Sequence, residues 1–335
     1  MELYLDSADI NEIEEAFKLG YIDGLTTTPT FMHREGVTDL DAMILKLAGI
    51  VPVLQIEALG STAEEIFDEA QRQLDLGLDK TKTVFKIPVS LEGTRACKML
   101  RNKGFLVNLH LVYTLQQAYM AMHAGATYVC PLVGRLQDQG QDALGLVRKC
   151  VEAVDKYGYD TNVMFSSVRH SQHVRNALDI GVHTCTIPWK VMKQLTENHF
   201  TTIGTDQFFE HTRLITETVG ENIRDFNPII PQGSTVLDAL VRMTQGKFGA
   251  VAVVDDGGQT LGVFTDGDLR RNLEKEGQNF LQKSLSELSY SEPITIDADA
   301  LLIDATKIFK DKKVDTVSVV TGGKQIGMLD IQDLV

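Results

Sequence analysis

The sequence predicts an α/β protein in two parts, a (β/α)8 TIM barrel followed by a smaller α+β module. Over the first two thirds, eight short apolar segments rich in β-formers alternate with segments of helical period. Such alternation indicates a parallel sheet, and eight units in roughly 200 residues favour a closed barrel. No G-x-G-x-x-G follows the first predicted strand, which argues against a doubly wound sheet. The last third contains an internal repeat.

The eight expected strands each have a helical segment after them. They read ELYLD from Glu2, GLTTTP from Gly24, VPVLQIEA from Val51, TVFKIPV from Thr83, LVNLHLV from Leu106, TYVCPLV from Thr127, NVMFSSV from Asn162 and HTCTIP from His183. The helical segment STAEEIFDEAQRQL, for example, opens with a capping residue and an acidic first turn. A further amphipathic helix is expected from about Asp206 to Arg224, packed on the barrel or on a neighbouring subunit.

The internal repeat starts after residue 224. Pro228 and Asp268 of the first copy correspond to Pro293 and Asp333 of the second, 65 residues later in both cases. Each copy predicts a strand, a helix, two strands across a Gly-Gly hairpin and a closing helix. We therefore expect a barrel with its additional helix over residues 1–224 and a pseudo-symmetric pair over 225–335. The two repeats span about 225–282 and 283–335, with a cleft between them.

Composition limits the partners and the compartment. A net charge of −14 argues against nucleic acid or an anionic membrane as partner. The four cysteines lack C-x-x-C spacing, so neither zinc nor a disulfide framework is indicated. His170 and His173 have no third ligand beside them, and we expect them on a solvated helix face with no metal. Without a leader or an apolar run of spanning length, the expected location is cytoplasmic.

Polar side chains share the inward side of six predicted strands. Phe85, Ile87 and Val89 point outward, so Lys86 between them points into the barrel. The same alternation places the following residues inward: Asp6, Thr26, Thr28, Gln55, Glu57, Asn108, His110, Ser167 and Arg169. Burying so many polar groups is costly unless they pair or serve chemistry. One interpretation is a self-satisfied network in which Lys86 is ion-paired to Asp6 or Glu57; the other is an active site.

A buried lysine favours its neutral form and can attack a ketone. The resulting iminium withdraws electrons and allows the adjacent C–C bond to break or form. Asp6, Gln55, Glu57 and His110 are candidates for handling the protons, and this chemistry needs no cofactor. Arg135, Ser167 and Arg169 together offer two guanidinium groups and a hydroxyl suited to a phosphate.

At these residues the chain is similar to the small transaldolase/fructose-6-phosphate aldolase family, over about residues 1–220. The segments that carry the resemblance are MELYLDSAD, GLTTTPT, TVFKIPVSLEG, VCPLVGR and VMFSSVR. The resemblance implies that Lys86 forms the Schiff base, Asp6 handles protons near it and Gln55 positions the catalytic water. It also implies that Asn108 contacts the bound ketose and that Arg135, Ser167 and Arg169 hold the phosphate.

Three positions depart from the family pattern. Thr28 replaces an asparagine, His110 replaces a threonine that helps to hold the catalytic water, and Leu132 replaces a Tyr or Phe. The substrate pocket is therefore expected to differ in its middle. His110 could act directly as an acid or base near neutral pH, or could only fill volume and donate one hydrogen bond.

The repeat module resembles a CBS-domain pair over about residues 225–335, and GVFTDGDLRR is its most telling segment. It looks especially like the modules attached to sugar-phosphate isomerases and sugar nucleotidyltransferases of surface-glycan pathways. The resemblance implies a nucleotide site at Thr265 and Asp268. In the second repeat Asp333 is kept, but Asp330 stands at the hydroxyl position and would repel a phosphate. The alternative is a module that only dimerises the protein.

Three functions follow as hypotheses. The first is a Schiff-base aldolase or transaldolase acting on a phosphorylated sugar and tuned by an adenine nucleotide or sugar nucleotide. The second is a Schiff-base isomerase, epimerase or dehydratase of a surface-sugar pathway. The third is a non-catalytic sugar-phosphate sensor. A homo-oligomer is expected in each case.

Overall fold

The computed structural model describes residues 1–290 and 292–334. The chain forms two compact units, Met1–Glu197 and Asn198–Val335. In the described part of the chain, none of the helices has both the length and the apolar character that a bilayer crossing requires.

The first unit is a closed barrel of eight parallel strands in sequence order, as predicted. The strands are β1 (Glu2–Asp6), β2 (Gly24–Thr26), β3 (Leu54–Glu57), β4 (Thr83–Pro88), β5 (Leu106–Val112), β6 (Tyr128–Pro131), β7 (Asn162–Phe165) and β8 (Thr184–Ile187). β8 pairs with β1 and closes the sheet. The barrel places the carboxyl ends of all strands at one mouth, where the polar side chains were expected.

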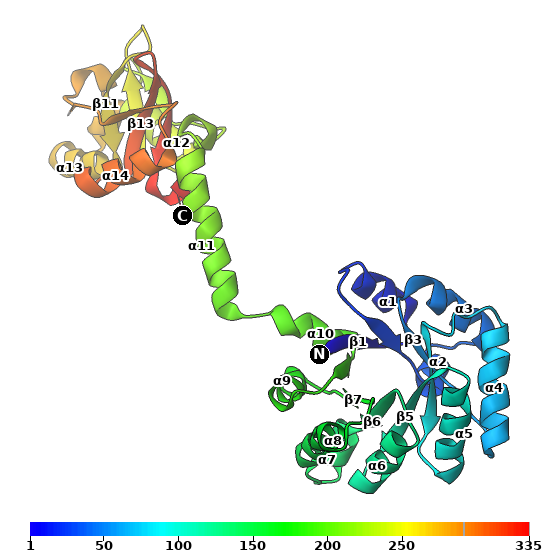
Figure 1. Ribbon diagram of the computed structural model, residues 1–335. Helices are drawn as coiled ribbons and strands as arrows, with labels where there is room; N and C mark the ends of the chain where they lie inside the picture. Colours follow the sequence, from blue (N-terminus) through cyan, green and yellow to red (C-terminus); the bar gives the residue numbers. More distant parts are fainter. Residues whose placement is uncertain (291, 335) are drawn as a thin grey trace. The chain divides into compact units, whose positions relative to one another are not determined.

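Helices surround the strands of this unit (Figure 1). They are α1 (Ile10–Phe17), α2 (Pro29–Arg34), α3 (Leu40–Ile50), α4 (Ala63–Asp75), α5 (Leu91–Asn102), α6 (Leu115–His123), α7 (Val133–Asp138), α8 (Ala143–Tyr157), α9 (Ser171–Ile180) and α10 (Trp189–Lys193). A 3-10 turn, Gln194–Thr196, follows α10. Side-chain caps begin several helices; Thr62 accepts a hydrogen bond from Glu65 N, and Ser90 accepts one from Gly93 N.

The barrel separates apolar from polar side chains by strand parity. Phe85 and Ile87 of β4 are fully buried in the core between strands and helices. Inside the barrel a smaller cluster containing Tyr4, Val84 and Met164 fills the end nearest the strand N-termini. The interior is therefore filled with apolar side chains at one end, and polar side chains occupy the mouth.

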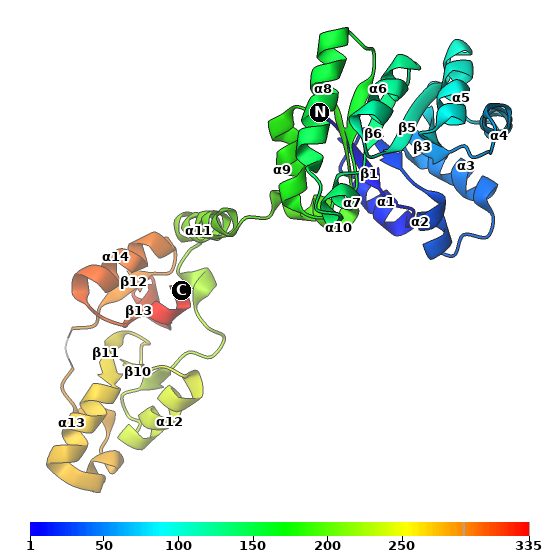
Figure 2. The ribbon, with the colours of Figure 1, turned by 90° about the horizontal axis from the view of Figure 1, so that it is seen from below.

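The second unit contains the predicted repeat. Its elements are α11 (His199–Thr216), β9 (Ile229–Pro231), α12 (Val236–Gly246), β10 (Ala250–Val254), β11 (Thr260–Thr265), α13 (Asp266–Glu276), β12 (Thr295–Asp297), α14 (Leu302–Lys312), β13 (Thr316–Thr321) and β14 (Lys324–Asp330). 3-10 turns cover Gly220–Asn222, Gly277–Gln282, Leu285–Glu287 and Ile331–Leu334. Two three-stranded sheets, β11-β10-β9 and β12-β13-β14, repeat one topology (Figure 2). The chain thus has the predicted barrel followed by CBS-like β/α repeats.

The additional helix differs from its prediction. α11 begins at His199 and ends at Thr216, and it groups with the second compact unit, whose first residue is Asn198. Leu214 packs on the core of the second repeat, and Arg213 Nη2 donates to the carbonyl of Asp333 at 2.8 Å. Phe208 and Phe209 are 73% and 72% exposed. The amphipathic pattern correctly indicated a helix, but it did not indicate which unit the helix contacts.

Candidate functional site

The strand register brings the predicted polar residues into two neighbouring layers of the barrel. In the deeper layer, Asp6, Thr26 and Gln55 are register partners on β1, β2 and β3. In the layer nearer the mouth, Glu57, Lys86 and Asn108 are register partners on β3, β4 and β5. Side chains that lie far apart in sequence therefore become neighbours around one axis.

Lys86, Glu57 and His110 form the centre of the site. Lys86 Nζ lies 3.1 Å from Glu57 Oε1 and donates to the carbonyl of Thr27 at 2.8 Å. His110 Nε2 lies 2.9 Å from Glu57 Oε2. All three side chains are less than 10% exposed. The close approach of His110 to Glu57 lacks hydrogen-bond alignment, and within residues 1–290 and 292–334 neither facing atom has a hydrogen-bond partner.

The charges in this cluster are coupled. Burial would raise the pKa of Glu57, but the ammonium of Lys86 and the imidazole of His110 outweigh it and hold this pKa below its usual value. Burial lowers the pKa of His110 despite the carboxylate of Glu57. Burial raises the pKa of Asp6, although Lys86 and Thr26 oppose the shift. The cluster therefore favours an ionised Glu57 beside a neutral His110.

Asp6 is held by hydroxyl groups on the neighbouring strands. Thr26 Oγ1 donates to Asp6 Oδ1 at 2.9 Å and lies 2.5 Å from Thr186 Oγ1. Thr186, on β8, was absent from the sequence-based site. Strand parity was the signal that could have found it, because Thr186 and Tyr4 are register partners and Tyr4 packs inside the barrel.

Gln55, expected to position the catalytic water, and Asn108, expected to contact the ketose, are bonded to each other across the two layers. Asn108 Nδ2 donates to Gln55 Oε1 at 2.7 Å, and both residues are fully buried. Among the described residues, none hydrogen-bonds Gln55 Nε2 or Asn108 Oδ1, so the pair has one donor and one acceptor left over. It is Glu57, two residues beyond Gln55, that contacts both Lys86 and His110.

The expected phosphate-binding residues lie around α7 and the loop after β7. A Cβ on Gly134 would lie 2.2 Å from the carbonyl oxygen of Ser167 and 2.9 Å from Arg169 Nε, so only glycine allows this approach. Ser167 has a positive φ of 60°. Arg169 is half-exposed and pairs with Asp138 at 2.5 Å, while Arg135 Nη1 donates to the hydroxyl of Tyr113 at 3.3 Å. The structure thus brings Ser167 and Arg169 together beside α7, the helix that carries Arg135.

The two remaining pocket positions have mainly structural contacts. Thr28 caps α2 by accepting from Phe31 N at 3.3 Å, and with Thr27 and Glu57 it lines a small cavity of about 20 Å³. Leu132 is buried, and its N–H donates to the carbonyl of Val112 at 3.2 Å.

The prediction that the histidine pair lies on a solvated face is wrong for one member. His173 is 1% exposed, and its Nε2 lies 2.7 Å from Gln137 Oε1. Burial first, and His170 second, lower its pKa to about 4. His173 therefore acts as a neutral link between α9 and α7.

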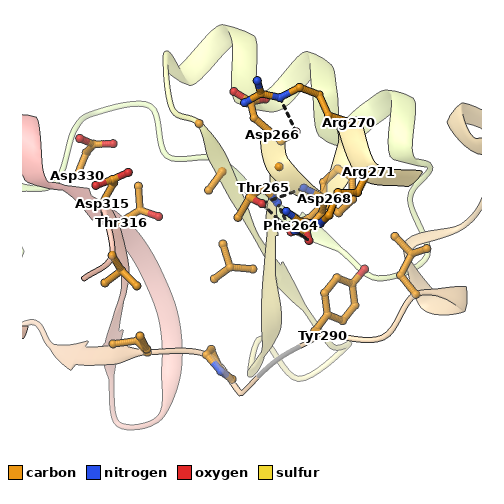
Figure 3. A pocket seen from close by; sticks show the side chains of 18 of the residues that line it. Phe264, Thr265, Asp266, Asp268, Arg270, Arg271, Tyr290, Asp315, Thr316 and Asp330 are labelled. Atoms are coloured by element: carbon orange, nitrogen blue, oxygen red, sulfur yellow. Dashed lines mark hydrogen bonds and ion pairs between the residues drawn. The ribbon is translucent and has the colours of Figure 1, made fainter. Parts of the chain in front are cut away.

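The second unit contains the expected cleft. A cavity of about 1070 Å³ lies between the repeats. Thr265, Asp268 and Arg271 line it from the first repeat, whereas Asp315 and Asp330 face them from the second (Figure 3). Arg270 also lines the cavity, so the first repeat contributes two arginines together with the carboxylates of Asp266 and Asp268.

Thr265 and Asp268 are bonded to each other. Thr265 Oγ1 donates to Asp268 Oδ2 at 2.7 Å, and Arg271 pairs with Asp268 Oδ1 at 2.5 Å. Burial would raise the pKa of Asp268, but its bonds to Thr265 and the charge of Arg271 lower it below the usual value. Any ligand that uses these groups must share or replace these contacts.

Asp333 was expected at the nucleotide site of the second repeat, but its side chain lies elsewhere. It is not among the residues that line the cavity; its Oδ1 lies 2.7 Å from both Nε and Nη2 of Arg224. Its Oδ2 accepts from the N–H of Asp330 at 3.0 Å. The 3-10 turn after β14 directs the side chain to Arg224, and Asp330 lines the cleft in its place.

The comparisons with known proteins match the chain to two families. The sequence model of the transaldolase/fructose-6-phosphate aldolase family matches residues 3–228, and that of the CBS domain matches residues 223–275 and 285–335. A probable transaldolase of Geobacter metallireducens is 37% identical over 211 residues, covering 63% of this chain and 97% of that protein. A probable transaldolase of Desulforudis audaxviator is 39% identical over 212 residues, covering 63% and 96%.

Among solved structures, a CBS domain protein of Pyrobaculum aerophilum complexed with AMP is 18% identical. It matches 35% of this chain and 88% of its own length, with a TM-score of 0.32.

Proposed function

Because the chain belongs to the transaldolase/fructose-6-phosphate aldolase family, we propose that its barrel is a Schiff-base aldolase or transaldolase acting on a phosphorylated sugar. The observation that carries this proposal is the buried lysine at the mouth of the barrel, 3.1 Å from a carboxylate that also faces a histidine. Family membership supports an enzyme of the transaldolase/aldolase class; the Schiff base and the phosphorylated substrate are our inference from the site.

In the proposed reaction Lys86 Nζ attacks the keto carbon and expels the oxygen as water, which leaves an iminium. Asp6 then removes the proton from the hydroxyl group on the carbon beyond the bond to be broken. The C–C bond electrons move to the iminium nitrogen, an aldehyde leaves, and an enamine remains on Lys86. Addition of a second aldehyde to this enamine gives transaldolase chemistry. Protonation followed by hydrolysis gives aldolase chemistry.

Glu57 and His110 serve the proton transfers to and from Lys86. Glu57 is ionised and touches Lys86, so it receives the proton that the ammonium must lose before attack. His110 is kept neutral by burial and can accept or return that proton from the other carboxylate oxygen. Glu57, and not Gln55, contacts both Lys86 and His110. For this reason we assign to Glu57 the water-positioning role that the resemblance placed on Gln55. We propose that Gln55 and Asn108 instead bind a substrate hydroxyl with their free donor and acceptor.

Arg135, Ser167 and Arg169 are proposed to hold the phosphate, with Thr28 and Leu132 shaping the middle of the pocket. Arg169 supports this role through its half-exposed guanidinium, which can exchange the carboxylate of Asp138 for a phosphate. The rigid approach of Gly134 to Ser167 fixes one side of the phosphate site.

A second candidate function rests on His110. An imidazole 2.9 Å from Glu57, at the position of the family threonine, could move a proton between carbons of the iminium instead of assisting cleavage. The product would then be an isomerised, epimerised or dehydrated sugar. The carbon count of the products distinguishes the two, because cleavage gives two fragments and proton movement gives one.

The cleft of the second unit is proposed to bind an adenine nucleotide or a sugar nucleotide that tunes the barrel. Its volume of about 1070 Å³ and the hydroxyl and arginines of the first repeat support this assignment. The carboxylates of Asp315 and Asp330 disfavour a second phosphorylated ligand. Four free, buried cysteines fit a reducing compartment, so we propose a cytoplasmic location. Separately, we propose that the protein is a homo-oligomer.

The test is borohydride trapping with a panel of phosphorylated ketoses and aldehydes, starting with fructose 6-phosphate, read by intact mass. We expect an adduct on Lys86 that is lost completely in Lys86→Ala, and its mass identifies the retained fragment. Lys82→Ala, an exposed lysine four residues earlier, is the matched control and should keep the adduct. Binding of sugar phosphates without any adduct would replace the enzyme with the sugar-phosphate sensor.

A further inference from the structure

Thr186 ends a chain of hydroxyl groups that leads to Asp6. Its Oγ1 lies 2.5 Å from Thr26 Oγ1, and Thr26 Oγ1 in turn donates to Asp6 Oδ1 at 2.9 Å. Thr26 and Thr186 are 2% and 4% exposed, so water has little access to either hydroxyl. The three side chains come from three adjacent strands, β8, β1 and β2, that close the barrel.

The number of hydroxyl protons fixes the direction of the hydrogen bonds that link Thr186, Thr26 and Asp6. A hydroxyl carries one proton, so a Thr26 that donates to an ionised Asp6 can only accept from Thr186. When Asp6 takes up a proton, the order can reverse: Asp6 donates to Thr26, and Thr26 donates to Thr186. The one other acceptor that Thr26 has among the described residues is the carbonyl of Leu5, at 3.4 Å. Asp6 can therefore remain hydrogen-bonded to Thr26 in both of its protonation states.

We propose that Thr186 is a positioning residue that keeps Asp6 oriented through its change of protonation during the reaction. This inference rests on the proposed function, in which Asp6 removes a proton from the substrate. Thr186 acts through Thr26 and has no described contact with Lys86. Coupled hydrogen bonds in a dry interior strengthen each other, so the third member influences the first.

The same strand supplies a matched control. Thr184 lies two residues before Thr186 on β8 and is fully buried, and no residue that the structure describes hydrogen-bonds its Oγ1. Thr184→Val therefore removes a buried hydroxyl of the same kind from the same strand without shortening the chain to Asp6. An effect of replacing a buried threonine of β8 by valine, apart from the loss of the hydrogen bond to Thr26, would appear in both variants.

The experiment compares wild type, Thr186→Val, Thr186→Ser and Thr184→Val in steady-state turnover across pH, with borohydride trapping on the same samples. Removing one buried hydrogen bond should lower kcat of Thr186→Val about tenfold with KM unchanged. The acid limb of its kcat profile should move to higher pH, because ionised Asp6 loses support. Thr186→Ser should restore both values, and Thr184→Val should match wild type.

The outcomes separate the two proposals. If wild type forms a Lys86 adduct and turns over, but Thr186→Val keeps the wild-type kcat and pH profile, Thr186 has no positioning role. Equal losses in Thr186→Val and Thr184→Val would also overturn it. No adduct and no turnover in wild type overturn the proposed function and this inference with it. Should Thr186→Val fail to fold, Thr186→Ala replaces it, with Thr184→Ala as its control.

Discussion

The barrel mouth and the cleft of the second unit both gather polar side chains, but they differ in how those side chains are satisfied. In the barrel, Lys86, Glu57 and His110 are almost fully buried, and in the described part of the chain Glu57 Oε2 and His110 Nε2 lack hydrogen-bond partners. In the cleft, Arg271 is 65% exposed, and its carboxylate partner Asp268 also accepts from Thr265. One site has unmet buried contacts, and the other is satisfied and open to solvent.

This difference indicates different tasks. Buried groups with unmet partners are costly and are retained where they act on a bound molecule, so the barrel is preorganised for chemistry. Groups that are already paired at the surface exchange partners at small free-energy cost, which suits reversible binding of a regulator. Substitutions should therefore have large effects in the barrel and modest effects in the cleft.

The largest effect is expected for Glu57→Gln. It removes the charge that faces both Lys86 and His110, so turnover should fall by about 10² to 10⁴. Breaking a buried pair also leaves the lysine uncompensated, and the free energy of unfolding should fall by about 3–5 kcal/mol. Turnover assays and urea denaturation measure the two quantities.

The control for this comparison is Glu64→Gln. Glu64 pairs with Arg95 in solvent, with both side chains more than half exposed, so its loss should cost under about 1 kcal/mol. Equal losses of stability in the two variants would remove the contrast between buried and exposed pairs.

Asp6→Asn should lower turnover by a similar factor of about 10² to 10⁴. At neutral pH it should raise the free energy of unfolding, whereas Glu57→Gln lowers it. Burial raises the pKa of Asp6 above its unfolded value, so its favourable contribution is present at low pH and is lost as the pH rises through the folded pKa. Asparagine does not ionise. The melting temperature of Asp6→Asn relative to wild type should therefore be higher at pH 8 than at pH 4.

Asp41→Asn tests the sign of that prediction. The hydrogen bond from Arg72 lowers the pKa of Asp41, so this variant should lose stability relative to wild type as the pH rises from 3 to 8. If both variants change in the same direction with pH, the proposed origin of the Asp6 effect is wrong.

Much of the barrel could be predicted from the sequence, because strand parity and strand–helix alternation are local patterns. Phe85 and Ile87 on either side of Lys86 were sufficient to place the lysine inside. The contact between Glu57 and His110 could not be predicted, because it depends on the register of β3, β4 and β5 around the closed sheet. Register follows from the stagger of the whole barrel, which no single segment encodes.

The second unit shows the same limit. The repeat alignment correctly predicted a strand, a helix and two further strands in each copy, and it paired Asp333 with Asp268. The chain closes with a 3-10 turn in the second repeat where the first has α13, and Asp333 then meets Arg224, 109 residues away in sequence. Corresponding residues of two repeats have equivalent surroundings only where the local backbone has the same conformation.

In the cleft, Thr265→Val should weaken AMP or sugar-nucleotide binding about tenfold, since it removes one hydroxyl from a hydrogen-bonded contact. Thr235→Val is the matched control. Thr235 forms the same capping box with Asp238, with a hydroxyl-to-carboxylate distance of 2.7 Å, and is not among the cavity-lining residues. Calorimetric titration of both variants measures the affinities, and equal weakening would show that the cap, not ligand contact, is responsible.

The smallest effect is expected at the pair of Arg169 and Asp138, which is exposed to solvent like the pair of Arg271 and Asp268 in the cleft. Asp138→Asn releases the guanidinium from its carboxylate, so phosphate no longer has to displace that partner. Exposed pairs contribute little, and KM for a phosphorylated substrate should fall only about two- to threefold, with kcat unchanged. Asp155→Asn, an exposed carboxylate on α8, should leave KM at the wild-type value. A raised KM in Asp138→Asn would mean that Asp138 orients Arg169 for the phosphate instead of competing with it, because the freed side chain would then have lost its position.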